Sequence, residues 1–149
     1  MRVPHDSYVL VADGAKMLFF RNEGDATAIN LQVVAAEQQR DDYDRDIKTD
    51  QAGQKPGIPG GPGGSTAGET DFHQQAEDRF AKEAAERINR AALAGTFEDL
   101  IVIASPKTLG ELRKHYGKQV QDKIRAEIAK DLTGHPVDRI EAALESHEE

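Results

Sequence analysis

Leu100-Ile101-Val102-Ile103-Ala104 is the stretch that decides the fold, because no other run of the chain is as apolar. It is short and rich in β-branched residues, which is typical of a central strand buried on both faces. Ser105 and Pro106 follow it as an N-cap and a first helical residue, and a helical pattern precedes it. A helix, a buried strand and a second helix in succession predict an α/β domain.

Three more strands are expected near the start of the chain. Residues 8–12 and 16–20 are apolar runs separated by Asp13-Gly14, a dipeptide that tolerates the positive φ angles of tight hairpin turns. Residues 29–35 alternate between the two faces, as a half-buried strand does. The three strands together predict a meander at the beginning of the sheet.

A long helix is predicted before the buried strand. Asp71 is a candidate N-cap, and from Phe72 onward small and apolar side chains recur at three- and four-residue spacing. Opposite charges lie four residues apart on the other faces of this helix. Gly95 is expected to end this helix. The narrow stripe of small residues suits a helix that packs closely against a sheet.

The last third of the chain contains one ambiguous segment. The helix from Pro106 is expected to end at Gly117. Residues 120–132 then fit either a helix or a strand, and periodicity alone leaves both open. His135-Pro136 opens a last helix, and we expect a frayed tail at about residues 145–149.

The composition changes abruptly between the third strand and the long helix. From Gly53 to Gly68, ten of sixteen residues are glycine or proline, and an aspartate-rich segment precedes them. Such a stretch buries too little apolar surface to offset the entropy of ordering it. We therefore expect a disordered loop at about residues 38–70 between the third strand and the first long helix.

Composition also excludes several classes of protein. The length of 149 residues suits one domain spanning residues 1–149. The chain has no cysteine, so disulfides, thiolate metal sites and cysteine nucleophiles are excluded. A net charge of -8 argues against binding to nucleic acid or to an anionic membrane through a large part of the surface. The polar start and the short first apolar run predict no signal peptide and no transmembrane segment, and hence a cytoplasmic protein.

Four short blocks carry a resemblance to a known family. They are residues 11–16 (VADGAK), 76–81 (AEDRFA), 105–113 (SPKTLGELR) and 130–133 (KDLT). With these blocks the chain resembles the bacterial host attachment family over nearly its whole length. The name of that family implies a role in binding to host cells.

The host attachment family is in turn similar to the middle domain of archaeal and eukaryotic peptide-chain release factors. The resemblance implies a single release-factor-like α/β domain with a ribonuclease-H-like mixed sheet of about five strands, packed with three to four helices. It also favours a strand at residues 124–128 and a loop at residues 130–134, against the helical alternative.

In release factors, a flexible loop ending in Gly-Gly-Gln precedes the long helix, and the glutamine helps to place a water for attack on the peptidyl-tRNA ester. The equivalent residues here are Gly63, Gly64 and Ser65. Serine replaces the glutamine, and the surrounding loop is poor in cations, so it would not be steered toward ribosomal RNA. We therefore expect no hydrolysis and assign no catalytic residue.

A ribonuclease-H-like fold also raises the question of a two-metal site, which would need clustered carboxylates. Asp13, Asp99 and Asp131 are the candidates, but each is explained equally well as a turn, flanking or loop residue. The five histidines are scattered, without the spacing of metal ligands. No metal and no cofactor are therefore expected.

One basic stretch remains as a candidate binding surface. Between Pro106 and Lys130 there are seven cations and three carboxylates. Such cations can contact the phosphates of RNA without base readout, although a solvated helix face is the simpler explanation. The residues assigned to this surface are Lys107, Arg113, Lys114, Lys118, Lys123 and Arg125.

The sequence thus predicts a non-catalytic binding domain of the host attachment family, whose partner is an unidentified protein. The alternative is a cytoplasmic protein associated with the ribosome or RNA, similar to a translation or rescue factor. A metal-dependent nuclease or hydrolase is disfavoured, because the candidate carboxylates have simpler explanations.

Overall fold

A five-stranded mixed sheet forms the centre of the computed structural model, which describes residues 1–38 and 61–147, the side chains of residues 61–71 excepted. The sheet has the order β3-β2-β1-β4-β5. The first three strands form an antiparallel meander, whereas β4 and β5 run parallel to β1. The strands are β1 (Tyr8–Ala12), β2 (Lys16–Asn22), β3 (Leu31–Gln38), β4 (Leu100–Ala104) and β5 (Ile124–Ala129). The predicted α/β class and mixed sheet are confirmed.

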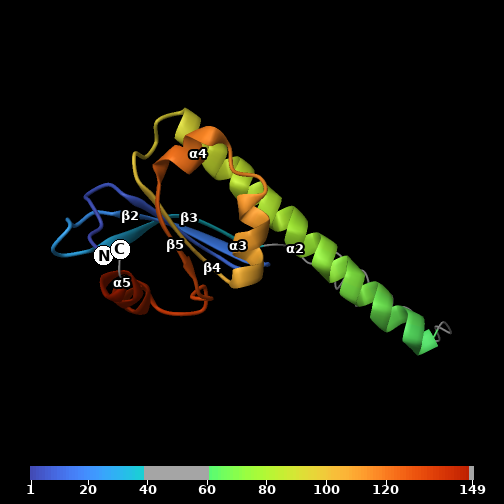
Figure 1. Ribbon diagram of the computed structural model, residues 1–149. Helices are drawn as coiled ribbons and strands as arrows, with labels where there is room; N and C mark the ends of the chain where they lie inside the picture. The colour runs from blue at the N-terminus through green and yellow to red at the C-terminus, as the bar shows by residue number, and fades with distance from the viewer. Residues whose placement is uncertain (39–60, 148–149) are drawn as a thin grey trace.

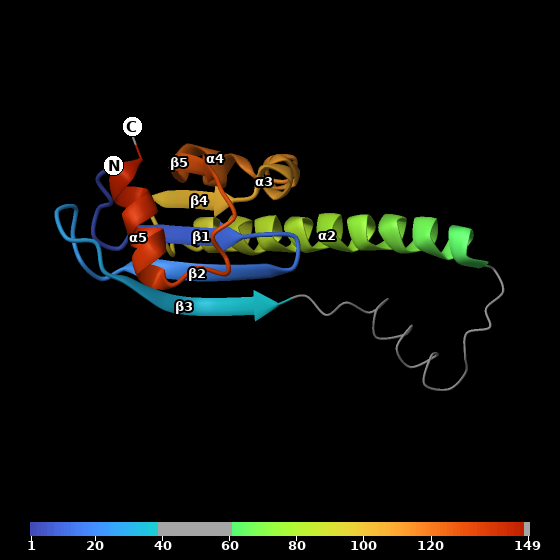
Figure 2. The ribbon, with the colours of Figure 1, turned by 90° about the horizontal axis from the view of Figure 1, so that it is seen from below.

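Helices cover both faces of the sheet (Figures 1 and 2). One face packs against the long helix and the two short helices near it, and the other packs against the last helix. The four helices in the described part of the chain are α2 (Gly61–Leu93), α3 (Pro106–Arg113), α4 (Lys118–Lys123) and α5 (Val137–Ser146).

Two hydrophobic cores lie on opposite sides of the sheet. Phe19 belongs to the core under α2, while its neighbour Phe20 belongs to the core under α5, because successive side chains of a strand point to opposite faces. All five residues of β4 are fully buried, as expected for a central strand covered on both faces. The small residues of α2, Ala81, Ala84 and Ala85, let this helix approach the sheet closely.

The hairpin between β1 and β2 forms in a different way from the one expected. Among the described residues only Asp6 and Gly95 have positive φ. Gly14 therefore does not adopt the positive φ angle that the Asp-Gly dipeptide predicts for a tight hairpin turn. Instead, the Asp13 carboxylate closes the turn, with Oδ1 accepting hydrogen bonds from the backbone N–H groups of Ala15 (2.8 Å) and Lys16 (2.7 Å). Gly95 has a φ of 72° and ends the long helix as predicted.

The long helix begins at Gly61 and not at Asp71, so the last ten residues of the expected loop belong to α2. Proline is tolerated there, because Pro62 lies in the first turn, where backbone N–H groups have no partner inside the helix. Once the packed part of a helix has formed, each further residue adds a hydrogen bond at little cost. The remainder of the expected loop, residues 39–60, lies outside the described residues.

The ambiguous segment contains both kinds of structure. The helix from Pro106 ends at Arg113, and Gly117 is the N-cap of the short helix α4. The strand β5 follows directly and confirms the expected strand at residues 124–128. A helix of six residues is too short for periodicity to separate it from the strand beside it.

The last helix extends further than the predicted frayed tail allows, because α5 continues to Ser146. Its final carbonyl groups have a partner in the N-terminal segment. The amino group of Met1 donates to the carbonyl oxygens of Leu144 (2.9 Å) and His147 (2.7 Å). A positive charge is favourable at the carboxyl end of a helix. Residues 148–149 lie outside the described part.

Candidate functional site

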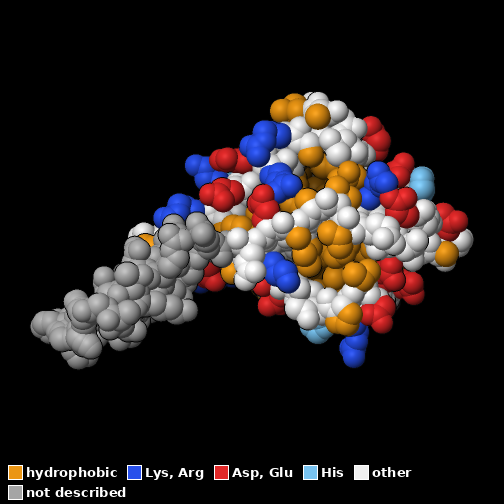
Figure 3. Space-filling view, turned by 180° about the vertical axis from the view of Figure 1, so that it is seen from behind, with side chains coloured by type: hydrophobic (Ala, Val, Ile, Leu, Met, Phe, Trp, Pro, Cys, Tyr) orange, Lys and Arg blue, Asp and Glu red, His pale blue; other side chains and the backbone are white. Residues whose placement is uncertain are grey.

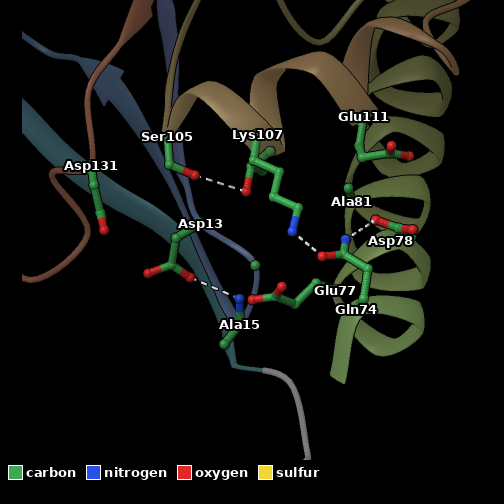
Figure 4. A pocket seen from close by; sticks show the side chains of 12 residues that line it. Asp13, Ala15, Gln74, Glu77, Asp78, Ala81, Ser105, Lys107, Glu111 and Asp131 are labelled. Atoms are coloured by element: carbon green, nitrogen blue, oxygen red, sulfur yellow. Dashed lines mark hydrogen bonds between the residues drawn. The ribbon is translucent and has the colours of Figure 1, made fainter. Parts of the chain in front are cut away.

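A polar pocket of about 290 Å³ lies at the carboxyl ends of β1 and β4. In the order β3-β2-β1-β4-β5, the chain continues from β1 to one side of the sheet and later returns to the other side at β4. Open α/β sheets bind their ligands at such a switch point, in the crevice beyond the strand ends. The lining residues are Asp13, Gly14, Ala15, Gln74, Glu77, Asp78, Ala81, Ser105, Lys107, Thr108, Glu111 and Asp131 (Figure 4).

Two aspartates meet on the sheet side of the pocket. The hydroxyl group of Thr133, which is buried, donates to Asp13 Oδ2 (2.5 Å) and lies 3.1 Å from Asp131 Oδ1. Asp13 follows β1 and Asp131 lies just beyond β5, so the parallel strands bring them to the same edge of the sheet. One Asp13 oxygen therefore holds the hairpin turn, while the other faces Thr133.

Gly14 leaves room for the Glu77 side chain of α2 at this edge. A Cβ atom at this position would lie 2.5 Å from Glu77 Oε2 and 2.7 Å from Glu77 Cγ, which is closer than such contacts permit. The Glu77 side chain therefore occupies the space that any larger residue at position 14 would need. Figure 4 shows its carboxylate directed toward the β1–β2 turn.

The opposite wall joins α2 to α3 through neutral and charged polar groups. The Lys107 ammonium group donates to Gln74 Oε1, and Gln74 Nε2 donates to Asp78 Oδ1 (2.8 Å), as Figure 4 shows. The Ser105 hydroxyl group, which was expected to cap α3, donates instead to Thr108 Oγ1 (2.9 Å). Hydrogen bonds thus link Lys107 of α3 to Gln74 and Asp78 of α2, and Ser105 to Thr108.

The lining is strongly acidic. It contains the carboxylates of Asp13, Glu77, Asp78, Glu111 and Asp131, and Lys107 is the one Lys or Arg among the lining residues. Within the described residues no three His, Asp or Glu side chains are grouped so that they could hold one metal ion. This arrangement favours a ligand with a positive charge and several hydrogen-bond donors over a phosphate.

Four cations of the predicted basic stretch lie in ion pairs. Glu127 Oε1 is 3.1 Å from Arg113 Nη2, and Glu111 Oε1 is 2.8 Å from Lys114 Nζ. Hydrogen bonding and charge attraction from these carboxylates raise the pKa of Arg113 and of Lys114. The other two pairs are Lys118 with Asp122 (3.5 Å) and Arg125 with Asp99 (3.4 Å).

The remaining two predicted cations have structural contacts. Lys107 lies in the wall of the pocket. Lys123 Nζ donates to the carbonyl oxygens of Phe97 (2.9 Å) and, more weakly, Ala92 (3.5 Å), and lies 5.8 Å from the centre of the Phe97 ring. All six residues therefore contact carboxylate, amide or carbonyl groups of the fold, while Arg113, Lys114 and Lys118 stay more than half exposed.

The three candidate carboxylates separate into two groups. Asp13 and Asp131 line the pocket together, whereas Asp99 precedes β4 at the opposite end of the strand and pairs with Arg125. Gly63, Gly64 and Ser65 belong to the first turns of α2, where side chains are not described. Sequence reasoning missed Gln74 and Glu77, since both look like ordinary polar residues of an amphipathic helix.

Comparisons with known proteins agree with this architecture. The sequence matches bacterial archaeo-eukaryotic release factor family 12 over residues 6–144. It is also similar to an uncharacterized protein of Rickettsia prowazekii, with 35% identity over 78 residues, which are 48% of this chain and 52% of that protein. The chain thus matches about half the length of this curated relative.

The structure adds one finding on membranes: no helix in residues 61–93 or 106–146 is long and apolar enough to cross a bilayer. The expected likeness to release factors is confirmed by the family match, which covers most of the chain, while the host attachment name stays a prediction. The chain belongs to bacterial archaeo-eukaryotic release factor family 12.

Proposed function

We propose that this chain is a non-catalytic binding domain that receives a cationic side chain of a partner protein in the pocket between β1 and β4. The observation that carries the proposal is the acidic lining of a pocket at the topological switch point. Glu77 and Asp131 are exposed, so a partner side chain can reach them. An arginine suits this pocket best, because its guanidinium group donates to carboxylates in pairs.

A translation partner is part of the proposal, since the name of the family refers to release factors. Many proteins that bind nucleic acid expose arginine- and lysine-rich segments, and an acidic pocket can capture such a segment. This partner implies a cytoplasmic protein. The host attachment resemblance implies a partner outside the cell instead. Immunodetection in cytosolic and surface fractions separates the two, because only the second places the protein at the cell surface.

Binding without hydrolysis is supported by the chemistry of the residues. Ser65 replaces the glutamine of the release-factor loop. In the pocket, the Ser105 hydroxyl group donates to Thr108, and no histidine lines the described walls to serve as its base. Peptidyl-tRNA hydrolysis on stalled ribosomes should therefore equal the spontaneous rate for the wild type, Ser65→Ala and Ser65→Gln. Release by the wild type that Ser65→Ala abolishes would make the protein an enzyme.

The binding test uses a fluorescent arginine-rich peptide and the same peptide with neutral citrulline in place of arginine. We expect the arginine peptide to bind, and Glu77→Gln or Asp131→Asn to weaken it about tenfold through the loss of a charge-assisted hydrogen bond. Gly14→Ala should do the same, because its Cβ displaces the Glu77 side chain. In the Glu77→Gln background, Gly14→Ala should add little.

Glu83→Gln is the matched control, because Glu83 is an exposed carboxylate of the same helix that does not line the pocket. It should leave the affinity for the arginine peptide unchanged. Equal binding of the citrulline peptide, or an equal loss of affinity in Glu83→Gln, would contradict a site in the pocket.

Association with RNA is the second candidate. It rests on the exposure of the cations: Arg113 is 56% exposed, Lys114 66% and Lys118 84%. Ion pairs of such exposed side chains contribute less than about 1 kcal/mol, so phosphates can compete for these cations. Weak, salt-sensitive RNA binding should be lost in Arg113→Glu/Lys114→Glu. It should persist in Lys82→Glu/Arg90→Glu, which reverses two exposed cations of α2. An equal effect of the two double substitutions on RNA binding would exclude the basic stretch as the RNA site.

A further inference from the structure

The free edge of the sheet at β3 is the strongest unassigned surface in the described part of the chain. The strand pairs with β2 on one side only. Its first backbone N–H, at Leu31, is covered by a hydrogen bond to Glu141 Oε2 of α5 (2.8 Å). No described residue covers the outer backbone groups from residue 32 to residue 38. An uncovered edge is a template for another strand.

Two large apolar side chains are exposed on this edge. Val33 is 56% exposed and Val34 is 49% exposed, and only Leu93 among the other large apolar residues described is comparably exposed. A β-bulge explains why both valines face solvent: Val33 lies opposite Phe20 and Ala35 lies opposite Phe19, so Val34 is the extra residue. The β3 edge faces the viewer in Figure 3, where hydrophobic side chains gather near the middle of the molecule.

The two edges of the sheet differ in charge. The other edge strand, β5, carries Arg125 and Glu127, which is a common way to prevent strands from pairing edge to edge. The β3 edge has no charged residue from Leu31 to Ala36 and no proline. Its single carboxylate, Glu37, is held by Arg87 of α2 in an ion pair. The chain as a whole has a net charge of -8, but two copies that approach each other through this uncharged strip would not bring like charges together.

We propose that the β3 edge pairs with the β3 edge of a second copy of this chain, in antiparallel orientation. A two-fold axis between Val33 and Val34 would place Val33 opposite Val34 of the second copy, a pair of β-branched residues that packs well across strands. Glu37 would then lie opposite the uncharged Asn30, so no carboxylates face each other. The strip is therefore complementary to itself, and the two sheets join into one of ten strands.

Sedimentation velocity over a range of concentrations tests this pairing with the full chain. The wild type should approach twice its monomer mass of 16.3 kDa as its concentration rises. Val33→Lys and Val34→Lys should each weaken dimerisation at least about tenfold, because each replaces an apolar pair and brings two like charges to neighbouring cross-strand positions at the centre of the interface. Leu93→Lys is the matched control, since Leu93 is 70% exposed on another element, and it should dimerise as the wild type does.

A chemical test fixes the contact without relying on loss of binding. The chain has no cysteine, so Val34→Cys introduces a single thiol. Under mild oxidation it should form a disulfide-linked dimer much faster than Leu93→Cys. A wild type that stays monomeric, a dimer that survives both valine substitutions, or equal cross-linking of the two cysteine variants would each overturn the proposal.

Discussion

Asn22 is fully buried at the end of β2, and its amide connects two segments that the sheet alone would not fix. Nδ2 donates to the carbonyl oxygen of Val3 (2.8 Å). Oδ1 accepts from the backbone N–H groups of Gly24 (2.9 Å) and Asn30 (2.9 Å). The N-terminal segment and the β2–β3 turn are therefore held by one side chain.

Asn22→Leu should lower the free energy of unfolding by about 2–4 kcal/mol, because an apolar side chain of similar size leaves three backbone groups without a partner. Urea denaturation followed by circular dichroism measures the change. Asn30→Leu is the control: the Asn30 side chain is exposed, so its replacement should cost less than about 0.5 kcal/mol. Similar losses in the two variants would show that the buried amide is not a special contact.

The buried hydroxyl group of Tyr116 should make the free energy of unfolding depend on pH in the alkaline range. Burial, and then the negative charge of Glu127, raise the pKa of Tyr116, whose hydroxyl group is buried without a hydrogen-bond partner among the described residues. The raised pKa of Tyr116 stabilises the folded protein fully below the unfolded-state pKa of about 10. This stabilisation is lost as the pH rises above that value, because only the unfolded chain releases the proton there.

Tyr116→Phe should remove this loss. The thermal midpoint of the wild type should therefore fall more steeply than that of Tyr116→Phe between about pH 9 and 11. At neutral pH the two proteins should be nearly equal, since the hydroxyl group has no described partner to lose. Parallel curves over the whole range would mean that Tyr116 ionises as readily in the folded protein as in the unfolded chain.

At the scale of elements, the strands were the most predictable part of the molecule. The apolar runs of β1 and β4 and the turn signal between β1 and β2 are local features, so the sequence alone indicates them. The conformation of the turn was not predictable in the same way. Gly14 lies against the Glu77 side chain of α2, and that contact joins residues 63 positions apart.

Helix boundaries were less predictable than the existence of helices. The start of α2 at Gly61 contradicts the glycine and proline content of that segment, because helix propensity is a weak preference that extension of a packed helix overrides. The short helix α4 was missed because its six residues carry one buried side chain, Val120, which is too little for a periodic pattern.

The end of α2 gives the prediction for this scale. Lys123 donates to the carbonyl oxygen of Phe97 and lies near that of Ala92 in the last turn of the helix, where a cation opposes the helix dipole. Lys123→Met keeps the apolar stem and removes the charge, so it should lower the free energy of unfolding by about 1 kcal/mol.

Chemical denaturation measures this difference against Lys118→Met. Lys118 is 84% exposed and forms only a surface ion pair with Asp122, so its replacement should cost less than about 0.5 kcal/mol. Equal costs at the two positions would show that Lys123 is a solvated side chain, as a basic RNA-binding surface requires.

At the scale of the whole molecule, the pocket is the feature that sequence reasoning reached only in part. Asp13 and Asp131 were identifiable, because polar residues that follow parallel strands come together at one edge of a sheet. Their link through Thr133 and the contribution of Glu77 depend on how α2 and the loop after β5 pack, and no local pattern encodes that packing. Two ion pairs of the basic stretch, Arg113 with Glu127 and Arg125 with Asp99, likewise join residues that are far apart in the sequence, so no local pattern indicates them.

The rate of amide hydrogen exchange should depend on the position of each strand in the sheet. The amides of β1 and β4, in the fully covered centre, should exchange only through global unfolding, whereas those of β3 should exchange through local opening. Mass spectrometry at low and high protein concentration measures both. Protection of β3 should rise with concentration as the edges pair, while that of β1 should stay constant. Slow exchange of β3 in dilute monomer would contradict this order.

The pocket has four walls from distant parts of the chain: the β1–β2 turn, α2, α3 and the loop after β5. None of them can form the site alone, so the unfolded chain has no such site. By mass action, a ligand at a hundred times its dissociation constant would stabilise the fold by about 2.7 kcal/mol. The melting temperature of the protein is thus itself an assay for its ligand, and a thermal-shift screen of cationic peptides and metabolites can find one before any activity is known.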